Sequence, residues 1–340
     1  MKYRQLADTG VFVSELCLGA MTFGGRGQIW ERIGGLDQTA VDSIVHRALD
    51  AGINFIDTAN VYGAGESETM LGKALGSNRN KVVLATKVRG RMGNEANQVG
   101  LSRLHIQEAV EASLSRLGTE YIDLYQIHRF DPLTNLEDTL RALDDLVHAG
   151  KVRYIGCSNL AAWQLMKALA ISREQHLERF RCTQSYYSQV GRELEREMMP
   201  LLKDQGVGLL VWSPLAGGFL SGKFTRDGGD DAARRTGFDF PPVNKEKGFA
   251  IVDVLRKVAG RHGASVAQSA LAWILANDAV TSVIIGARNV SQLDDNLKAV
   301  DVTLSAEDVA ALDEASKLAL EYPAWMEVLG SDRRPGERRF

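Results

Sequence analysis

Four side chains with complementary chemistry follow or end short apolar segments of this sequence, namely Asp57, Tyr62, Lys87 and His128. A phenol has a reference pKa of about 10, and a nearby ammonium stabilises the phenolate and makes the phenol a better acid. Lys87 would supply that ammonium, and Asp57 would keep it charged. A neutral His128 would hydrogen-bond and orient a carbonyl oxygen. The four groups therefore predict proton donation to an oxygen as a hydride reaches the attached carbon.

Each of these residues also has an ordinary structural explanation. A tyrosine just after a strand is usually a packing residue, and a strand-end lysine usually extends its charge to solvent. Chemistry is favoured because polar residues end or follow most of the predicted strands, where charged groups are costly unless paired or used. The four side chains contain no carboxylate pair for glycoside cleavage and no Ser-His-Asp arrangement, and we expect no metal centre.

The elements that must position these residues are eight short apolar runs, which alternate with segments of helical period. Their apolar cores are nearly continuous, as in parallel strands covered on both faces. Eight βα units can form a closed barrel or a doubly wound open sheet. In a barrel the polar strand ends meet at the C-terminal rim, where barrel enzymes carry out their chemistry. The predicted strands are Leu16–Gly19, Ile53–Asp57, Val82–Lys87, Ile122–His128, Val152–Cys157, Cys182–Gln184, Gly208–Trp212 and Val283–Gly286.

Two features lie outside this repeat. Tyr3–Leu6 and Val11–Glu15 flank Thr9-Gly10, which predicts a hairpin before the first barrel strand. The gap between the seventh and eighth strands is about twice as long as the others; it holds the glycine- and aspartate-rich stretch Asp227–Gly237, predicted to be a loop, and then two helical segments. We find no linker and expect one domain over residues 1–340.

The composition is that of a globular protein able to bury a large core: 340 residues, 45% hydrophobic and 24% charged, with a net charge of −3. This balance argues against nucleic-acid or membrane partners. The N-terminus has no apolar signal region, and no apolar run approaches the roughly 18 residues needed to span a bilayer, so we expect a cytoplasmic protein. Cys17, Cys157 and Cys182 are interpreted as buried thiols in a reducing compartment.

Three further patterns concern a cofactor. No Gly-x-Gly-x-x-Gly follows a strand, so a dinucleotide would not be held as in a Rossmann fold. The segment Gly217–Phe224 resembles a P-loop but ends in phenylalanine where Ser or Thr is required, which disfavours an ATPase and leaves Lys223 and a glycine-rich backbone as plausible phosphate contacts. Gly286–Asn289 opens a helix, and Arg288 there favours a phosphate. Trp212 offers a flat face for stacking.

Six segments, in chain order, resemble the aldo-keto reductases. The Trp-Ser-Pro-Leu form at 212–215 is similar to the branch that contains bacterial reductases and the β-subunits of voltage-gated potassium channels. The resemblance covers nearly the whole chain and implies a (β/α)8 TIM barrel with an N-terminal β-hairpin and extra helices after strands 7 and 8. The six segments are Asn54–Gly63, Leu84–Lys87, Asp123–His128, Ile155–Asn159, Trp212–Gly218 and Ile285–Arg288.

The resemblance also implies NADP(H), bound in an extended form at the C-terminal rim, and roles for individual residues. Tyr62 would be the proton donor, with Asp57, Lys87 and His128 as its partners and Asp57 also near the cofactor. Arg288 favours the additional phosphate of NADP. The implied contacts are Ser158, Asn159 and Gln184 for the nicotinamide carboxamide, Trp212 for its ring, Ser213, Leu215, Gly217 and Lys223 for the pyrophosphate, Gly286, Arg288, Gln292 and Asn296 for the adenosine phosphate, Asp295 for the adenine edge, and Met21 and Thr22 near the ribose.

We expect an oxidoreductase that reduces small aldehydes or ketones, reversibly toward the alcohol. Two alternatives remain: a cofactor-binding regulatory subunit that resembles the potassium-channel β proteins, and a Schiff-base aldolase using Lys87. The aldolase is disfavoured because a lysine paired with Asp57 stays protonated. A homo-oligomer is compatible with the sequence. Substrate choice would depend on Arg26–Asp37 and Asp227–Pro242, which vary in the family and leave the substrate open.

Overall fold

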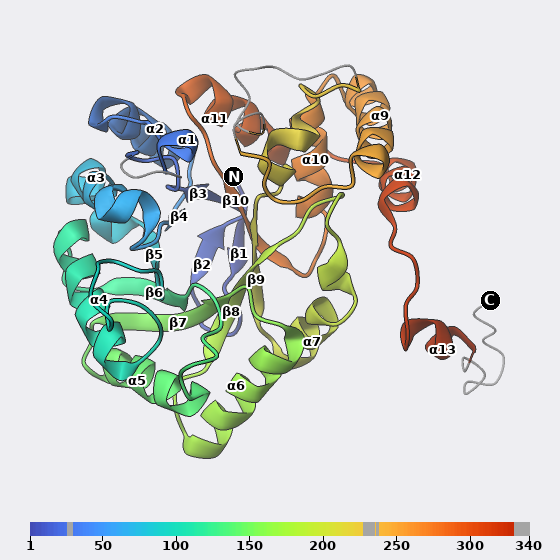
Figure 1. Cartoon of the computed structure of the whole chain (residues 1–340). Coiled ribbons are helices and arrows are strands. Elements are labelled where there is room, and N and C mark those ends of the chain that lie inside the picture. Colours follow the sequence, from blue (N-terminus) through green and yellow to red (C-terminus); the bar gives the residue numbers. More distant parts are fainter. Residues whose placement is uncertain (26–29, 227–234, 236–237, 330–340) are drawn as a thin grey trace.

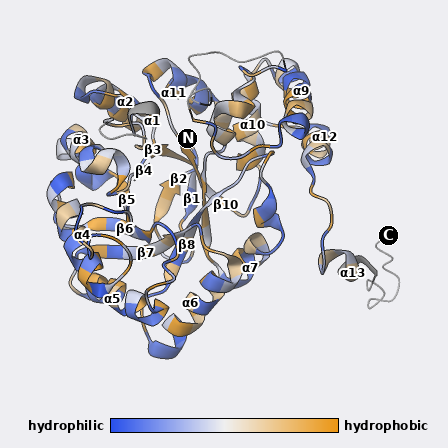
Figure 2. Cartoon of the chain, viewed as in Figure 1, coloured by the Kyte–Doolittle hydropathy of each residue, from blue (hydrophilic) through white to orange (hydrophobic). Residues whose placement is uncertain are grey.

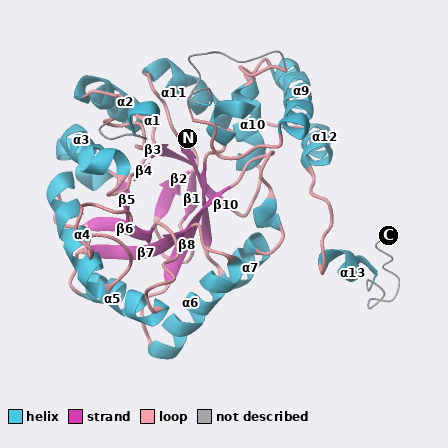
Figure 3. Ribbon diagram, viewed as in Figure 1, coloured by secondary structure: helices cyan, strands magenta, loops and turns pink. Residues whose placement is uncertain are grey.

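The computed structural model describes residues 1–25, 30–226, 235 and 238–329 of the chain. Eight parallel strands form a closed barrel in the order β10-β3-β4-β5-β6-β7-β8-β9, surrounded by helices (Figures 1 and 3). This confirms the (β/α)8 barrel and excludes the doubly wound sheet, because strand order follows the chain and β10 pairs with β3. The strands are β3 (Leu16–Gly19), β4 (Phe55–Asp57), β5 (Val83–Val88), β6 (Ile122–Ile127), β7 (Val152–Ser158), β8 (Phe180–Tyr186), β9 (Gly208–Trp212) and β10 (Val280–Ile285).

Most helices around the barrel bury one face, and they carry both hydrophilic and hydrophobic residues (Figure 2). In α5, Leu136, Leu140 and Leu143 recur at helical spacing and are buried, and the Asn135 side chain caps the helix by accepting from Glu137 N at 2.9 Å. The α-helices are α1 (Trp30–Ile33), α2 (Gln38–Asp50), α3 (Glu66–Leu75), α4 (Arg103–Leu117), α5 (Leu136–His148), α6 (Ala162–Gln175), α7 (Met198–Gln205), α9 (Lys245–His262), α10 (Val266–Leu275), α11 (Val290–Leu297), α12 (Ala306–Ser316) and α13 (Ala324–Leu329).

The predicted N-terminal hairpin is confirmed: β1 (Tyr3–Gln5) pairs antiparallel with β2 (Phe12–Ser14). Leu6 and Val13 are buried in the same cluster as the interior side chains of the barrel strands, and the hairpin crosses the centre of the ring in Figure 1. Arg4 donates to the carbonyls of Leu275 and Val280, both at 2.6 Å. The hairpin thus fills one end of the barrel and leaves the C-terminal rim as the end where a site can form.

Side-chain alternation along the strands explains why polar groups collect at that rim. Residues two apart in a strand point to the same face. On β4, β5, β6, β8 and β9, an interior apolar residue is therefore followed, two positions nearer the rim, by a residue that faces the same interior. The lower members of these pairs belong to one buried cluster, and the upper members are mostly polar. The pairs are Phe55 and Asp57, Ala85 and Lys87, Leu124 and Gln126, Cys182 and Gln184, and Leu210 and Trp212.

Element bounds differ from prediction at several strands. β8 extends beyond the predicted Cys182–Gln184 at both ends, because Ser185 and Tyr186 still pair with β9 and Phe180 pairs with Ile155 on β7. β10 starts at Val280 and ends before Gly286, because Val280 already pairs with Leu209. The predicted loop Asp227–Gly237 lies outside the described residues except for Arg235, and residues 26–29 of the other variable segment lie outside them too.

The three cysteines are buried and free, as predicted. No helix in the described ranges is both long and apolar enough to cross a membrane. The extra helical segments predicted after the seventh and eighth barrel strands are present as α9 after β9 and as α12 and α13 beyond α11.

Candidate active site

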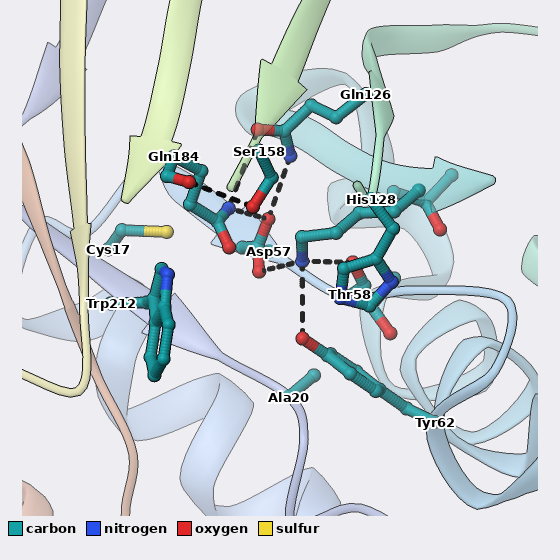
Figure 4. A network of polar contacts seen from close by, with 12 residues as sticks. Cys17, Ala20, Asp57, Thr58, Tyr62, Gln126, His128, Ser158, Gln184 and Trp212 are labelled. Atoms are coloured by element: carbon teal, nitrogen blue, oxygen red, sulfur yellow. Dashed lines mark hydrogen bonds and ion pairs between the residues drawn. The ribbon is translucent and has the colours of Figure 1, made fainter. Parts of the chain in front are cut away.

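Lys87 is the centre of a buried polar cluster at the rim. Figure 4 shows Asp57, Thr58 and Tyr62 of this cluster close together. The Lys87 ammonium nitrogen Nζ donates to Asp57 Oδ2 at 2.5 Å, to the carbonyl oxygen of Thr58 at 2.8 Å and to Tyr62 Oη at 3.4 Å. The lysine side chain is completely buried. A lysine ammonium has three donor hydrogens and no acceptor, so these three contacts use its full capacity. The phenol oxygen of Tyr62 therefore accepts from Lys87 and keeps its own proton for another acceptor.

The charge on Lys87 is maintained by its neighbours. Burial opposes the charged form, but the Asp57 carboxylate and then the Tyr62 oxygen outweigh it, and the pKa of Lys87 is raised above its ordinary value. The side chain is thus an ammonium at neutral pH. A Schiff-base nucleophile needs the free amine, so this environment disfavours the aldolase alternative.

Asp57 is bound on both of its oxygens. Oδ2 accepts from Lys87, whereas Oδ1 accepts from Gln126 Nε2 at 3.0 Å and from Gln184 Nε2 at 2.7 Å. Gln184 was predicted to contact a cofactor carboxamide; because its amide nitrogen is bound to Asp57, the group it can offer such a ligand is its oxygen Oε1. Gln126 was missed by sequence reasoning, although a polar residue two positions before His128 on an apolar strand is a usable signal.

His128 follows the end of β6 and faces the phenol. Its ring meets the Tyr62 ring edge-on, with centroids 5.7 Å apart and an interplanar angle of 78°. Burial, and then the positive charge of Lys87, lower the pKa of His128 to about 3. The imidazole is therefore neutral over the physiological range and can hydrogen-bond a carbonyl oxygen without carrying charge.

The depressed pKa of His128 makes stability depend on pH in a definite direction. The unfolded histidine titrates at about pH 6.5 and the folded one at about 3, so between these values the unfolded state binds the extra proton. His128 should therefore lower the free energy of unfolding progressively as pH falls through this window. We expect His128→Asn to show a shallower loss of stability between about pH 7 and about pH 4.5 in urea unfolding. The control is His148→Asn at an exposed histidine; equal slopes for wild type and His128→Asn would contradict the assignment.

The four predicted nicotinamide contacts lie beside this cluster and are linked to one another. Ser158 Oγ donates to the Gln184 carbonyl at 2.8 Å, and Asn159 Nδ2 donates to Ser158 Oγ at 2.9 Å. Asn159 Oδ1 accepts from Trp212 Nε1 at 3.0 Å. The strand ends of β7, β8 and β9 thus present one connected set of polar groups around the indole of Trp212, which Figure 4 shows across the cluster from Tyr62.

Aromatic rings that the sequence did not single out surround this set. Phe240 stacks on Trp212 with centroids 5.9 Å apart and planes 9° apart, and Tyr186 lies 5.2 Å from the same indole. Trp30 lies 5.5 Å from the Tyr62 ring. The buried Arg235 donates to the carbonyl of Pro241 at 2.9 Å, which fixes the segment that carries Phe240. Both Trp30 and Phe240 fall inside the two segments predicted to set substrate choice.

The predicted pyrophosphate contacts follow β9 in a tight turn. Ser213 Oγ accepts from Gly217 N at 3.0 Å, and Gly217 has a φ of 66°. At Gly218, with a φ of 95°, an added Cβ would meet no atom within 4 Å, so open space borders the backbone there. Leu215 is partly buried and Lys223 is exposed. A glycine-lined backbone beside open space, with a lysine nearby, fits a phosphate group.

The predicted adenosine contacts cluster around the start of α11. Asn289 caps the helix, Arg288 N donates to Gln292 Oε1 at 2.9 Å, and Asn296 Nδ2 donates to the Gly286 carbonyl at 3.3 Å. An added Cβ on Gly286 would also meet no atom within 4 Å. Open backbone, a helix N-terminus and an arginine fit a phosphate.

Asp295 and Thr22, two of the predicted cofactor contacts, hydrogen-bond other residues of the protein. Asp295 accepts from Gln268 Nε2 at 2.6 Å and Ser265 Oγ at 3.1 Å, which ties α11 to the start of α10. Thr22 Oγ1 donates to the Ala287 carbonyl at 3.1 Å, and Met21 precedes it in the same turn after β3. This hydrogen bond joins the loops after the first and last barrel strands.

The fold is a (β/α)8 barrel with a buried polar cluster at its C-terminal rim, and comparison with known proteins gives the family. The model of the Aldo/keto reductase family matches residues 15–317. The chain therefore belongs to the aldo-keto reductase family, as the resemblance of its motifs implied.

The chain matches its relatives over nearly the full length of both proteins. The chain is 38% identical to the "Uncharacterized oxidoreductase YrpG" of Bacillus subtilis, over 92% of this chain and 95% of that protein. It is 36% identical to the versiconal hemiacetal acetate reductase of Aspergillus parasiticus, over 92% and 96%. It is also 37% identical to a probable voltage-gated potassium channel subunit beta of Arabidopsis thaliana, over 89% and 92%. Family and relatives together support an oxidoreductase that reduces carbonyl groups.

Proposed function

We propose that the protein is an NADP(H)-dependent reductase that converts small aldehydes or ketones to alcohols, reversibly, with Tyr62 as the proton donor. The observation that carries the proposal is the contact of the buried Lys87 ammonium with both Asp57 and Tyr62. We further propose that it acts in the cytoplasm, as one domain over residues 1–340, on a small-molecule substrate.

The proposed mechanism divides the work among the four residues. When bound, NADPH supplies the hydride. Tyr62 hydrogen-bonds the carbonyl oxygen and gives it a proton as negative charge develops there. Lys87 stabilises the resulting phenolate, and Asp57 keeps Lys87 charged and in place. The neutral imidazole of His128 donates a second hydrogen bond that orients the carbonyl oxygen toward the phenol.

The proposed cofactor site runs around the rim from Trp212 to Arg288. Trp212 would stack against the nicotinamide, and its carboxamide would meet the linked polar groups at the ends of β7 and β8. The residues we propose to hold the cofactor are Met21, Thr22, Asp57, Ser158, Asn159, Gln184, Trp212, Ser213, Leu215, Gly217, Lys223, Gly286, Arg288, Gln292, Asp295 and Asn296.

The proposal is tested by mixing the purified chain with NADPH and a panel of aldehydes and ketones. We expect quenching of tryptophan fluorescence on NADPH addition, through Trp212, and loss of NADPH absorbance when a carbonyl compound is added. The relative from Arabidopsis favours one second candidate, a cofactor-binding regulatory subunit; quenching without turnover on any carbonyl compound would support it. If NADPH caused no quenching and no carbonyl compound were reduced, both candidates would be refuted.

Arg288 should determine the preference for NADPH. Arg288→Ala is expected to weaken NADPH binding by about 1–3 kcal/mol through the loss of a charged hydrogen bond, with little change for NADH. The matched control is Lys223→Ala, which removes a cation proposed to contact the pyrophosphate shared by both cofactors and should weaken both equally. Fluorescence titration gives the dissociation constants of wild type and of both variants for NADPH and for NADH. Equal losses for NADPH and NADH in Arg288→Ala would show that Arg288 does not contact the additional phosphate.

A further inference from the structure

Gln126 belongs to the buried polar cluster, but the proposed mechanism gives it no role. It is completely buried on the inner face of β6, two residues before His128. In the strand register it is opposite Lys87 on one side and Gly156 on the other. A buried amide costs free energy unless its polar atoms are hydrogen-bonded, so its partners indicate why a polar residue stands there.

Both ends of the Gln126 amide are engaged within the cluster. Nε2 donates to Asp57 Oδ1 at 3.0 Å, and Oε1 accepts from Gln184 Nε2 at 3.4 Å. Because an amide has distinct donor and acceptor ends, this arrangement directs both glutamine NH2 groups at the same carboxylate oxygen. The other oxygen, Oδ2, is then the one that faces Lys87.

A glycine on the intervening strand makes this contact possible. Gln126 is on β6 and Gln184 on β8, and on β7 between them Gly156 is opposite Gln126 on one side and Cys182 on the other. A Cβ on Gly156 would lie 2.8 Å from Cys182 Sγ and 3.2 Å from Gln126 Cγ. The space that a side chain of β7 would fill is thus used by Cys182 and by the aliphatic part of Gln126, whose amide reaches Asp57 and Gln184.

We propose that Gln126 is a positioning residue of the reaction: its amide holds Asp57 Oδ1 so that Oδ2 stays on Lys87 and Lys87 stays against the Tyr62 phenol. This inference rests on the proposed function for its catalytic consequence, but the hydrogen-bonded chain from Gln126 to Tyr62 exists in the free protein. Loss of the amide would leave Asp57 Oδ1 with a single donor and free the carboxylate to turn. Lys87 would then stabilise the phenolate less well.

The test compares Gln126→Met, which keeps the length of the side chain and removes its amide, with Gln126→Glu. The first readout needs no cofactor: the ultraviolet absorbance of tyrosinate is titrated in each variant and in the same variant carrying Tyr62→Phe, and the difference gives the titration of Tyr62. We expect it to move up by about one pH unit in Gln126→Met. The second readout is kcat and KM for carbonyl reduction, with kcat expected to fall about tenfold or more and the KM for NADPH to stay nearly unchanged.

Gln126→Glu provides the rescue. Two carboxyl groups that share a site cannot both ionise readily, so the new glutamic acid holds its proton to a higher pH than usual. While protonated it donates to Asp57 Oδ1 in place of the amide. Activity should therefore approach that of wild type at acidic pH and fall as pH rises and the glutamic acid ionises. The matched control is Gln189→Met: the Gln189 amide is equally buried but has no hydrogen-bond partner among the described residues, and we expect its activity and titration to match those of wild type.

The outcomes separate this inference from the proposed function. An unchanged Tyr62 titration and an unchanged kcat in Gln126→Met would overturn the inference. A fall in NADPH affinity with an unchanged Tyr62 titration would also overturn it, because Gln126 would then act through Gln184 alone. The inference would likewise fail if the pH profile of Gln126→Glu had the same shape as the wild-type profile. Wild-type protein without carbonyl reduction would refute the proposed function, and the absorbance titration of the free protein would still decide the role of Gln126.

Discussion

Replacing Tyr62 by phenylalanine is expected to lower kcat for carbonyl reduction by about 10²–10⁴-fold, the usual contribution of a positioned general acid. The phenol is the one group of the cluster that accepts from Lys87 while keeping a proton to give, and its Oη lies 3.4 Å from Nζ. Phenylalanine keeps the ring that lies beside Trp30 and His128, so the packing of these rings should be preserved. The dissociation constant for NADPH, measured by fluorescence, should change little.

The interpretation depends on separating chemistry from cofactor release. Single-turnover absorbance measurements with enzyme in excess report the reduction step directly, and the loss should appear there in full. Tyr186→Phe is the matched control, because it removes a different phenol, which lies close to Trp212. The Tyr186 hydroxyl accepts from Ser188 Oγ at 3.0 Å and has no role in the proposed mechanism. Normal single-turnover rates in Tyr62→Phe would remove Tyr62 from the mechanism.

Replacing Lys87 by methionine is expected to produce the largest combined loss of activity and stability. Lys87 is completely buried and Asp57 almost so, and their charged atoms are 2.5 Å apart. Removing the cation leaves a buried carboxylate without its partner, which costs about 3–5 kcal/mol in comparable pairs. Turnover should be lost because the phenolate formed at Tyr62 has no ammonium beside it. Urea unfolding and steady-state kinetics measure the two effects.

A double-mutant cycle gives this prediction its control. Asp57→Asn alone should also be strongly destabilising, because it leaves the buried ammonium of Lys87 without a counter-charge. The variant with both substitutions removes both charges, and its free energy of unfolding should fall by clearly less than the sum of the two single losses. Additive losses would mean that the ion pair contributes nothing specific to stability, whatever the kinetics of the three variants.

The convergence of the polar strand ends could be predicted from sequence because it depends on chain order and strand polarity alone. In a parallel barrel every strand delivers its C-terminal residue to the same rim, so Asp57 and Lys87 meet without any knowledge of loop conformation. The N-terminal hairpin was equally accessible, since alternation and a Thr-Gly turn are local signals. The bounds of β8 and β10 were not, because pairing with a neighbour extends a strand past its apolar core.

The residues that sequence reasoning missed are those whose role depends on a third partner. Gln126 reads as an isolated polar residue in an apolar strand, and its role appears only when Gly156 on β7 leaves space for it to approach Gln184. Phe240 is distant in sequence from Trp212, and their stacking depends on how Arg235 holds the intervening backbone. The first contact depends on the space between neighbouring strands and the second on loop geometry, and neither leaves a periodic signal in the sequence.

The pairing of β3 with β10 has a consequence for how the protein is made. Leu16 pairs with Val283, and Arg4 hydrogen-bonds the carbonyl of Val280, so the ring joins chain segments that leave the ribosome at opposite ends of synthesis. Until the last strand is translated, β3 and β9 expose unpaired backbone edges that invite pairing with other chains. Nascent chains truncated before Val280 should consequently be dependent on chaperones and prone to aggregate, whereas those extending past Leu297 can complete the barrel.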